Sequence, residues 1–310
     1  MKTAICLMGP TASGKTDVAV SLCKRFPFDI ISVDSALVYR GMDIGTAKPD
    51  AATLHRTPHR LIDIRDPEES YSAGEFVRDA RAEMDAIFAQ GQVPLLVGGT
   101  MMYFRALTAG IADLPSASAE IRAIIDAEAE QSGWLAMHER LRAVDPVAAK
   151  RVKPNDRQRI QRGLEVYLSS GKPLSEWQKV GPGASVDDVR FVKIALQPAT
   201  RRILHERIEM RLNLMLNNGF VEEVKELYER KGLTPQHSSM RSVGYRQLWQ
   251  YLDGECTLDE AAARALAATR QLAKRQITWL RSEQELQSFD PLEADKIDAI
   301  SASLIEFLDA

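Results

Sequence analysis

Eight residues close to the start of the chain have the types and spacing of a loop that binds phosphate groups. Residues 9–16 fit the pattern G-x-x-x-x-G-K-[ST], in which backbone N–H groups and a lysine surround an anion. Lys15 would reach the terminal phosphate, and Thr16 would offer its hydroxyl to Mg²⁺. The pattern indicates a polyphosphate or a pyrophosphate, without identifying which one or what happens to it. The predicted phosphate-binding residues are Gly9, Pro10, Thr11, Ala12, Ser13, Gly14, Lys15 and Thr16.

A carboxylate is the second candidate for chemistry. Asp34 follows a β-branched run at residues 28–33, and open α/β sheets bind their ligands beyond the carboxyl ends of such strands. The alternative is that Asp34 only caps a helix or stabilises a turn. The segment at residues 38–49 is rich in glycine and polar residues and lacks a clear period, which is typical of a functional loop.

The elements that would position these residues alternate between strands and helices. Apolar runs predict strands at residues 3–8, 28–33, 59–64, 93–97 and 189–196. Helices are predicted at residues 17–25, 75–90, 201–218, 220–231 and 258–282, whereas the acidic tail at 288–310 has no distinctive pattern. Because the strand runs are apolar throughout, we expect a parallel sheet covered on both faces, in an α/β fold with a P-loop NTPase-like core.

A change of pattern predicts a second domain. From about residue 113 the strand-like runs stop, charged helical segments follow, and residues 181–185 are typical of a flexible connection. We therefore expect a helical insertion at 113–185 within a catalytic core of residues 1–112 and 186–310. Residues 150–162 in the insertion carry six basic residues against one acidic residue. This cluster indicates either a surface for RNA phosphates or a solvated helix face.

Composition excludes several classes of protein. The net charge is −3, so any nucleic-acid surface must come from local clustering of basic residues. Cys6, Cys23 and Cys256 are odd in number and far apart, which favours free thiols in a reducing compartment, and we expect a cytoplasmic protein. The start of the chain is too short for a signal peptide, and no apolar run approaches membrane-spanning length. The five histidines lack metal-ligand spacing, so a structural zinc is not expected.

The residues considered so far leave three functions open. The predicted strand at 93–97 ends in Gly-Gly-Thr, without the aspartate that commonly holds Mg²⁺ in nucleotide hydrolases. Asp34 could serve a metal or a hydroxyl acceptor in a small-molecule kinase that consumes ATP. It could instead be a general base that removes a proton from an incoming nucleophile. A third possibility is an RNA-binding module with a vestigial nucleotide site.

Seven blocks of sequence, in order, resemble the bacterial tRNA dimethylallyltransferases, which are also called tRNA isopentenyltransferases. The resemblance extends from about residue 3 to residue 282, and the order of the blocks makes it specific. The blocks are GPTASGKT (9–16), ISVDSALVY (31–39), MDIGTAKP (42–49), HRLIDI (59–64), VGGTMMY (97–103), VGYRQ (243–247) and TRQLAKRQITWL (269–280).

The resemblance implies a reaction and its partners. The family transfers a dimethylallyl group from dimethylallyl diphosphate to N6 of adenine 37, beside the anticodon of tRNAs that have adenine at position 36 and read codons starting with U. The products would be N6-(dimethylallyl)adenosine and diphosphate, with Mg²⁺ as the cofactor, and we expect a monomer. The phosphate loop would then hold a leaving pyrophosphate, not the γ-phosphate of a nucleotide.

The resemblance also assigns roles to residues. Lys15 would stabilise charge on the pyrophosphate, Asp34 would take the proton of N6, and Thr100 would hydrogen-bond near the base and pyrophosphate. Arg211 is a candidate second cation for the pyrophosphate, with a surface ion pair as the alternative. The helical insertion would clamp the anticodon stem-loop. The residues expected to contact tRNA are Asp34, Ser35, Ala36, Leu37, Thr100, Arg122, Gln158, Arg159, Ile160, Gln161, Arg162, Arg241, Ser242, Val243, Gly244, Tyr245, Arg246, Lys274, Arg275, Gln276, Ile277, Thr278, Trp279, Leu280 and Arg281.

Overall fold

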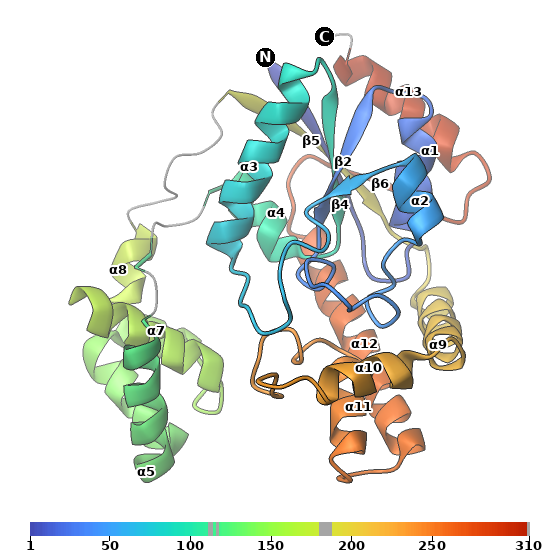
Figure 1. Ribbon diagram of the computed structural model, residues 1–310. Helices are drawn as coiled ribbons and strands as arrows, with labels where there is room; N and C mark the ends of the chain where they lie inside the picture. The colour runs from blue at the N-terminus through green and yellow to red at the C-terminus, as the bar shows by residue number, and fades with distance from the viewer. Residues whose placement is uncertain (111–113, 116–117, 180–187, 309–310) are drawn as a thin grey trace. The chain divides into compact units, whose positions relative to one another are not determined.

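The chain divides into two compact units. The computed structural model describes residues 1–110, 114–115, 118–179 and 188–308. One unit comprises Met1–Thr108 together with Asp187–Ala310, and the other comprises Ala109–Val186. The larger unit contains a sheet and helices, and the smaller unit contains helices (Figure 1). The expected connection at residues 181–185 and the expected boundary at residue 113 lie outside the described residues.

A six-stranded parallel sheet forms the centre of the larger unit, which confirms the predicted α/β fold. The order across the sheet is β3-β2-β4-β1-β5-β6. Because β4 lies between β1 and β2, the loops that follow these three strands emerge beside one another at the carboxyl edge. The strands are β1 Lys2–Met8, β2 Phe28–Val33, β3 His59–Arg60, β4 Val93–Gly98, β5 Val189–Leu196 and β6 Leu286–Phe289.

Helices cover both faces of this sheet, as the apolar strand runs predicted. On one face pack α1 (Lys15–Cys23) and α13 (Lys296–Leu308), and on the other pack α3 (Ala73–Ala89) and α4 (Met101–Thr108). Figure 1 shows the two pairs on opposite sides of the strands. The predicted apolar stripe of α3 is confirmed, because its four residues are almost inaccessible to solvent: Phe76, Ala80, Met84 and Ile87.

The predicted third strand is shorter than its apolar pattern suggested. Only His59–Arg60 pairs with β2, and the expectation of a strand through residue 64 is wrong. Leu61 and Asp63 have φ angles of 63° and 55°, which a strand does not allow. The chain turns here because the N–H groups of Asp63 and Ile64 donate to the segment that follows Asp34, at distances of 3.2 and 2.9 Å.

Helices complete the carboxy-terminal half of the larger unit. Three of them match the predicted positions to within a few residues, namely α9 (Arg201–Asn217), α10 (Phe220–Tyr228) and α12 (Leu258–Leu280). Elsewhere in the larger unit, three short helices lie outside the predicted ranges: α2 (Ala51–Arg56), α4 and α11 (Tyr245–Leu252). The acidic tail, for which we predicted no element, adds the edge strand β6 and helix α13 to the core.

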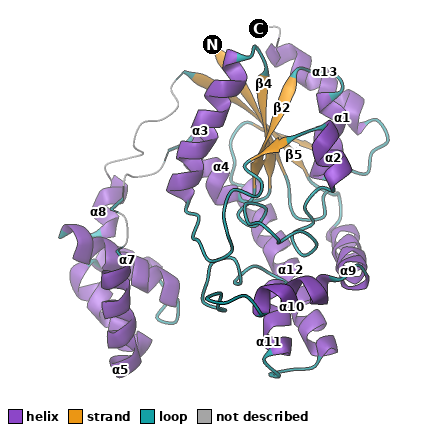
Figure 2. Cartoon of the chain, viewed as in Figure 1, coloured by secondary structure: helices purple, strands orange, loops and turns teal. Residues whose placement is uncertain are grey.

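The smaller unit has a hydrophobic core of its own. It is built from α5 Ala119–Val144, α6 Pro146–Arg151, α7 Arg157–Ser170 and α8 Leu174–Lys179, and α5 is kinked at Gly133. Its core joins residues of α5 and α7 with Ala149 of α6. Figure 2 shows the helices of this unit and the strands of the larger one by colour.

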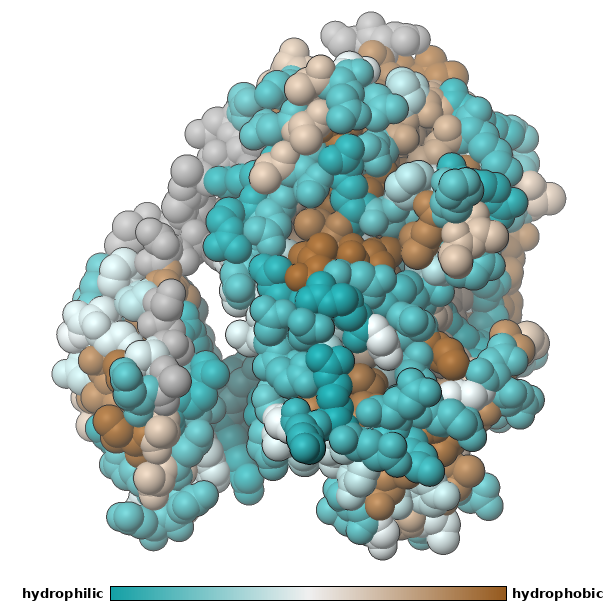
Figure 3. Space-filling view, viewed as in Figure 1, coloured by the Kyte–Doolittle hydropathy of each residue, from teal (hydrophilic) through white to brown (hydrophobic). Residues whose placement is uncertain are grey.

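The visible face of each unit is mostly hydrophilic, with smaller hydrophobic patches (Figure 3). Over the described residues, we find no helix that combines the length and the apolar character needed to cross a membrane.

Candidate active site

Three loops with chemically useful residues leave the sheet at the same level. Gly98 on β4 is the register partner of both Met8 on β1 and Val33 on β2. The phosphate loop, Asp34 and Thr100 therefore follow neighbouring strand ends. Gly98 permits this close packing, because a Cβ at that position would lie 2.0 Å from the carbonyl oxygen of Val33. The sheet order thus brings together residues that are far apart in the sequence.

The phosphate loop leads directly into the first turn of α1. Gly14 precedes the helix with a φ of 85°, a conformation that favours glycine. Gly9 packs under β5, and a Cβ there would lie 2.9 Å from the carbonyl oxygen of Leu196. Within the described chain no side chain caps the start of α1. Its first N–H groups are therefore available to an anion.

Lys15 is folded back over this loop. Its Nζ donates to the carbonyl oxygens of Gly9 at 3.0 Å and Pro10 at 2.8 Å. Burial lowers the pKa of Lys15 to about 7, while the Asp34 carboxylate raises that pKa and Arg211 lowers it. A bound diphosphate would supply opposite charge at this ammonium group and favour its protonated form.

Asp34 has one occupied and one available carboxylate oxygen. Its Oδ1 accepts hydrogen bonds from the N–H groups of Ala36 at 2.8 Å and Leu37 at 3.3 Å, so Asp34 does stabilise a turn. Among the described residues no donor is hydrogen-bonded to Oδ2. The turn fixes the carboxylate, and Oδ2 is left free to accept a proton. The turn-forming role and the general-base role are therefore compatible.

Thr100 joins the end of β4 to the Asp34 turn. Its N–H donates to the carbonyl oxygen of Val33 at 3.3 Å, and its Oγ1 accepts from the N–H of Ser35 at 3.1 Å. The Thr100 hydroxyl is therefore hydrogen-bonded to Ser35, the residue that follows Asp34.

Helix α9 brings two arginines to the phosphate loop. Arg207 Nε donates to the carbonyl oxygen of Ala12 at 2.8 Å. Arg211 lies one turn further along; burial lowers its pKa, the Asp34 carboxylate raises it and Arg207 lowers it. Arg211 makes no ion pair within the described residues, so it is available to a ligand. Sequence reasoning missed Arg207, although its spacing of four residues from Arg211 places both on one helix face.

Gln276 on α12 contacts two of the loops. Its Oε1 accepts from the N–H of Thr11 at 2.9 Å, and its Nε2 donates to the carbonyl oxygen of Gly99 at 2.8 Å. Its side chain is buried. The resemblance expects Gln276 among the tRNA contacts, whereas its side chain is hydrogen-bonded within the protein interior.

The loop at residues 43–45 is held by a carboxylate that the sequence analysis did not identify. Glu223 on α10 accepts from the N–H groups of Asp43, Ile44 and Gly45, at 2.8, 2.6 and 3.1 Å. Tyr245 also donates to it at 2.6 Å. This arrangement fixes the glycine-rich segment predicted as a functional loop.

The residues present fit a magnesium ion that is held mainly by a phosphorylated ligand. Among the described residues no group of three or more His, Cys, Asp and Glu is placed to bind a metal. Thr16 is on the first turn of α1, next to Lys15, and the structure gives its hydroxyl no hydrogen-bond partner among those residues. Mg²⁺ commonly takes few protein ligands and completes its shell with phosphate oxygens and water.

The other predicted tRNA residues of the larger unit divide into exposed and buried groups. Tyr245 and Leu280 are 0% and 1% exposed, so their side chains stabilise the core and cannot reach an RNA. Gly244 is also buried. The accessible or partly accessible residues are Ser35, Ala36, Leu37, Arg241, Ser242, Val243, Arg246, Lys274, Arg275, Ile277, Thr278, Trp279 and Arg281.

The predicted contacts in the smaller unit divide in the same way. Ile160, another expected tRNA contact, has its side chain fully buried in the core formed with α5. Arg122 and Arg162 both pair with the buried Glu165, at 2.8 and 3.6 Å. Arg159 is largely exposed, with a side-chain accessibility of 72%. The remaining two are Gln158, which is exposed, and Gln161, which donates to Asp126 at 2.8 Å.

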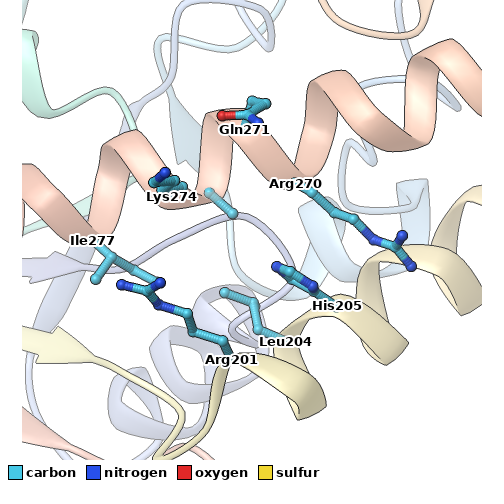
Figure 4. A pocket seen from close by; sticks show the side chains of 8 residues that line it. Arg201, Leu204, His205, Arg270, Gln271, Lys274 and Ile277 are labelled. Atoms are coloured by element: carbon cyan, nitrogen blue, oxygen red, sulfur yellow. The ribbon is translucent and has the colours of Figure 1, made fainter.

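A cavity of about 240 Å³ lies between α9 and α12. Figure 4 shows Arg201 and His205 on α9 and Arg270 and Lys274 on α12 around it. Its lining includes no residue of the phosphate loop, nor Asp34 or Thr100. We therefore locate the candidate active site at the strand ends and not in this cavity.

Comparison with known proteins gives consistent matches over most of the chain. A family model described as IPP transferase matches residues 37–283. The crystal structure of a full-length tRNA isopentenylpyrophosphate transferase from Bacillus halodurans is 36% identical, with a TM-score of 0.72, and the match covers 99% of this chain and 97% of that chain.

Two further solved structures are similar. A tRNA delta(2)-isopentenylpyrophosphate transferase from Staphylococcus epidermidis is 32% identical, with 99% of each chain covered and a TM-score of 0.71. A eukaryotic dimethylallyltransferase acting on tRNA is 25% identical, with 98% of this chain and 78% of that chain covered and a TM-score of 0.80.

Proposed function

The chain belongs to the IPP transferase family, and from this premise we propose that it prenylates tRNA. The specific reaction is transfer of the dimethylallyl group of dimethylallyl diphosphate to N6 of adenine 37, in tRNAs that read codons starting with U. The products are N6-(dimethylallyl)adenosine and diphosphate. The observation that carries this proposal is that the phosphate loop with Lys15 and the Asp34 turn follow adjoining strand ends, while α9 brings Arg211 close enough to interact with the charges of both residues. It supports anion binding and proton removal in one site.

The phosphate loop serves the leaving group in this reaction. As the allylic C–O bond breaks, negative charge grows on the departing diphosphate. The uncapped N–H groups at the start of α1, the Lys15 ammonium and Arg211 would stabilise that charge. Thr16 would hold Mg²⁺, which when bound supplies further charge neutralisation on the diphosphate oxygens.

Asp34 serves the nucleophile. The lone pair of an exocyclic adenine amine is delocalised into the ring, so N6 attacks poorly unless its proton is removed. As the new C–N bond forms, Oδ2 of Asp34 accepts that proton while Oδ1 remains held by the turn. Thr100 accepts a hydrogen bond from the N–H of Ser35, the residue after Asp34, and would thereby help to hold the turn that carries this carboxylate.

The adenine must leave the anticodon loop before it can react. A base stacked in that loop is turned out into the site, and the exposed basic residues of both units contact the RNA backbone. Arg159, Arg246 and Arg275 are exposed in this way.

The experiment is incubation with dimethylallyl diphosphate, Mg²⁺ and an unmodified tRNA, followed by digestion and mass analysis of the nucleosides. The proposal predicts a single prenylated adenosine that is absent when the RNA has another base at position 37. Transfer of label from ATP to a small molecule would instead support a kinase. RNA binding without any covalent change would contradict the proposal.

A further inference from the structure

Gln276 connects the two substrate-binding halves of the candidate site. On one side its Oε1 takes the N–H of Thr11 in the phosphate loop, at 2.9 Å. On the other side its Nε2 donates to the carbonyl oxygen of Gly99 at the end of β4, at 2.8 Å. Gly99 leaves no space for a side chain there, because a Cβ would lie 2.6 Å from Gln276 Nε2. The Gln276 amide is thus in direct contact with both Thr11 and Gly99.

The contacts continue from Gly99 to the candidate base. The next residue, Thr100, is hydrogen-bonded to Val33 through its N–H and to Ser35 through its hydroxyl. Ser35 adjoins Asp34. A displacement of α12 relative to β4 would therefore change the position of the phosphate loop relative to the Asp34 turn, and with it the alignment of leaving group and nucleophile.

We propose that Gln276 is a positioning residue, which holds the phosphate loop in register with the strand end that carries Thr100. A primary amide suits this role because one planar group offers both an acceptor and a donor. The side chain is only 8% exposed, so it would act through the two loops that it contacts. The kinetic part of this inference rests on the proposed tRNA prenylation, whereas its binding part does not.

The binding test uses inorganic diphosphate with Mg²⁺ and calorimetry on the full chain. Gln276→Met keeps the length of the side chain but leaves Thr11 N–H and Gly99 C=O without partners. We expect roughly a 10-fold to 100-fold loss of diphosphate affinity, and tRNA affinity within about twofold of wild type. Gln271→Met is the matched control, because Gln271 is an exposed glutamine on the same helix. It should bind both ligands as wild type does.

A second variant separates positioning from simple loss of packing. A protonated glutamic acid presents the same acceptor and donor as glutamine, whereas the carboxylate lacks the donor. Since burial raises the pKa of a carboxyl group, Gln276→Glu should recover affinity relative to Gln276→Met as the pH falls from about 8 to about 6. Because the diphosphate itself titrates over this range, the affinity of Gln276→Glu is divided by that of Gln276→Met at each pH.

Three results would overturn the inference. One is a loss of tRNA affinity with unchanged diphosphate affinity, which would make Gln276 an RNA contact. Another is a lowered melting temperature with normal diphosphate affinity, kcat and KM for the folded fraction, which would make it merely structural. The third is a ratio of the diphosphate affinities of Gln276→Glu and Gln276→Met that does not change with pH. If wild type binds diphosphate but forms no prenylated adenosine, the proposed function fails while the binding test remains decisive.

Discussion

Asp34 uses its two carboxylate oxygens differently, and this difference determines how its role can be tested. Asparagine at this position would keep an oxygen for the N–H groups of Ala36 and Leu37 but would lose the basic oxygen. We expect Asp34→Asn to lower kcat by about 10²- to 10⁴-fold, the usual contribution of a positioned base, with tRNA affinity unchanged. Rapid-quench kinetics and a binding titration measure the two quantities.

The matched control is Asp50→Asn, which makes the same change at the helix cap of α2, where Asp50 accepts from Thr53 N–H at 2.6 Å. It should leave kcat unchanged. If Asp34→Asn lowered tRNA affinity and kcat together, Asp34 would be a binding residue.

Arg211 gives a second prediction at the residue scale. It lies near Lys15 and Asp34 without an ion pair among the described residues, so its charge is available to a diphosphate. Arg211→Gln should weaken diphosphate binding about tenfold or more, because a charge-assisted contact is lost. Arg202→Gln removes the same charge from an exposed position of α9, where Arg202 pairs with Glu206 at 3.0 Å. Diphosphate affinity is measured by calorimetry. If both variants lost it equally, Arg211 would act only through its long-range charge and not through a direct contact.

At the scale of the element, a strand could be predicted where the local sequence determines its position and length, but not where contacts with distant residues determine where it ends. The apolar runs at β1, β2, β4 and β5 gave their positions and the fold class. The third strand was overextended, because hydrogen bonds to the segment after Asp34 force the chain to turn at Leu61 and Asp63. The phosphate loop was recognisable from spacing alone. The roles of Gln276 and Glu223 were not, since their partners are far away in sequence.

Asp145 carries an element-scale prediction for the helical unit. It is buried at the start of α6, and its carboxylate accepts from Ala148 N–H at 2.9 Å and from Ser175 N–H at 2.8 Å. Burial raises the pKa of Asp145, but hydrogen bonds from Ser175 and Ala148 outweigh it and hold the pKa below its ordinary value. Asp145→Ala should cost about 1–3 kcal/mol of unfolding free energy at neutral pH.

The sign of the pH dependence follows from the lowered pKa. The unfolded chain binds the proton more tightly, so the stabilisation is present above about pH 4 and is lost as the pH falls through the folded-state pKa. Amide hydrogen exchange over residues 119–179 should therefore show a difference between wild type and Asp145→Ala that shrinks in acid. Glu130→Ala serves as the control, because Glu130 is an exposed residue of α5 in the same unit. A difference that grew below pH 4 would refute the assignment.

At the scale of the whole molecule, an acidic chain must bind RNA through local basic clusters. Its net charge is −3, yet residues 150–162 carry six basic residues. The Arg159 side chain is 72% exposed, and among the residues described its only ion pair is with Asp156 of the preceding turn. Arg162 is partly committed to Glu165 and to the Pro115 carbonyl oxygen. The structure therefore separates two arginines that the sequence treated alike.

We expect Arg159→Ala to weaken tRNA binding and to reduce the slope of log K against log salt by about 1, the effect of one lost phosphate contact. Arg159→Ala together with Arg162→Ala should reduce it further. Arg142→Ala is the control in the same unit, since Arg142 is exposed and pairs with Glu139. An unchanged slope, measured by filter binding between about 50 and 200 mM salt, would remove Arg159 from the interface.

The most direct test is a single-turnover reaction of the wild-type chain and of Asp34→Asn with dimethylallyl diphosphate, Mg²⁺ and an unmodified tRNA anticodon stem-loop. Diphosphate and prenylated adenosine are counted in the same samples. We predict one diphosphate for each prenylated adenosine in the wild type, and a large, equal fall in both products with Asp34→Asn while both substrates remain bound. Prenylated adenosine forming at the wild-type rate without the Asp34 carboxylate would contradict the account.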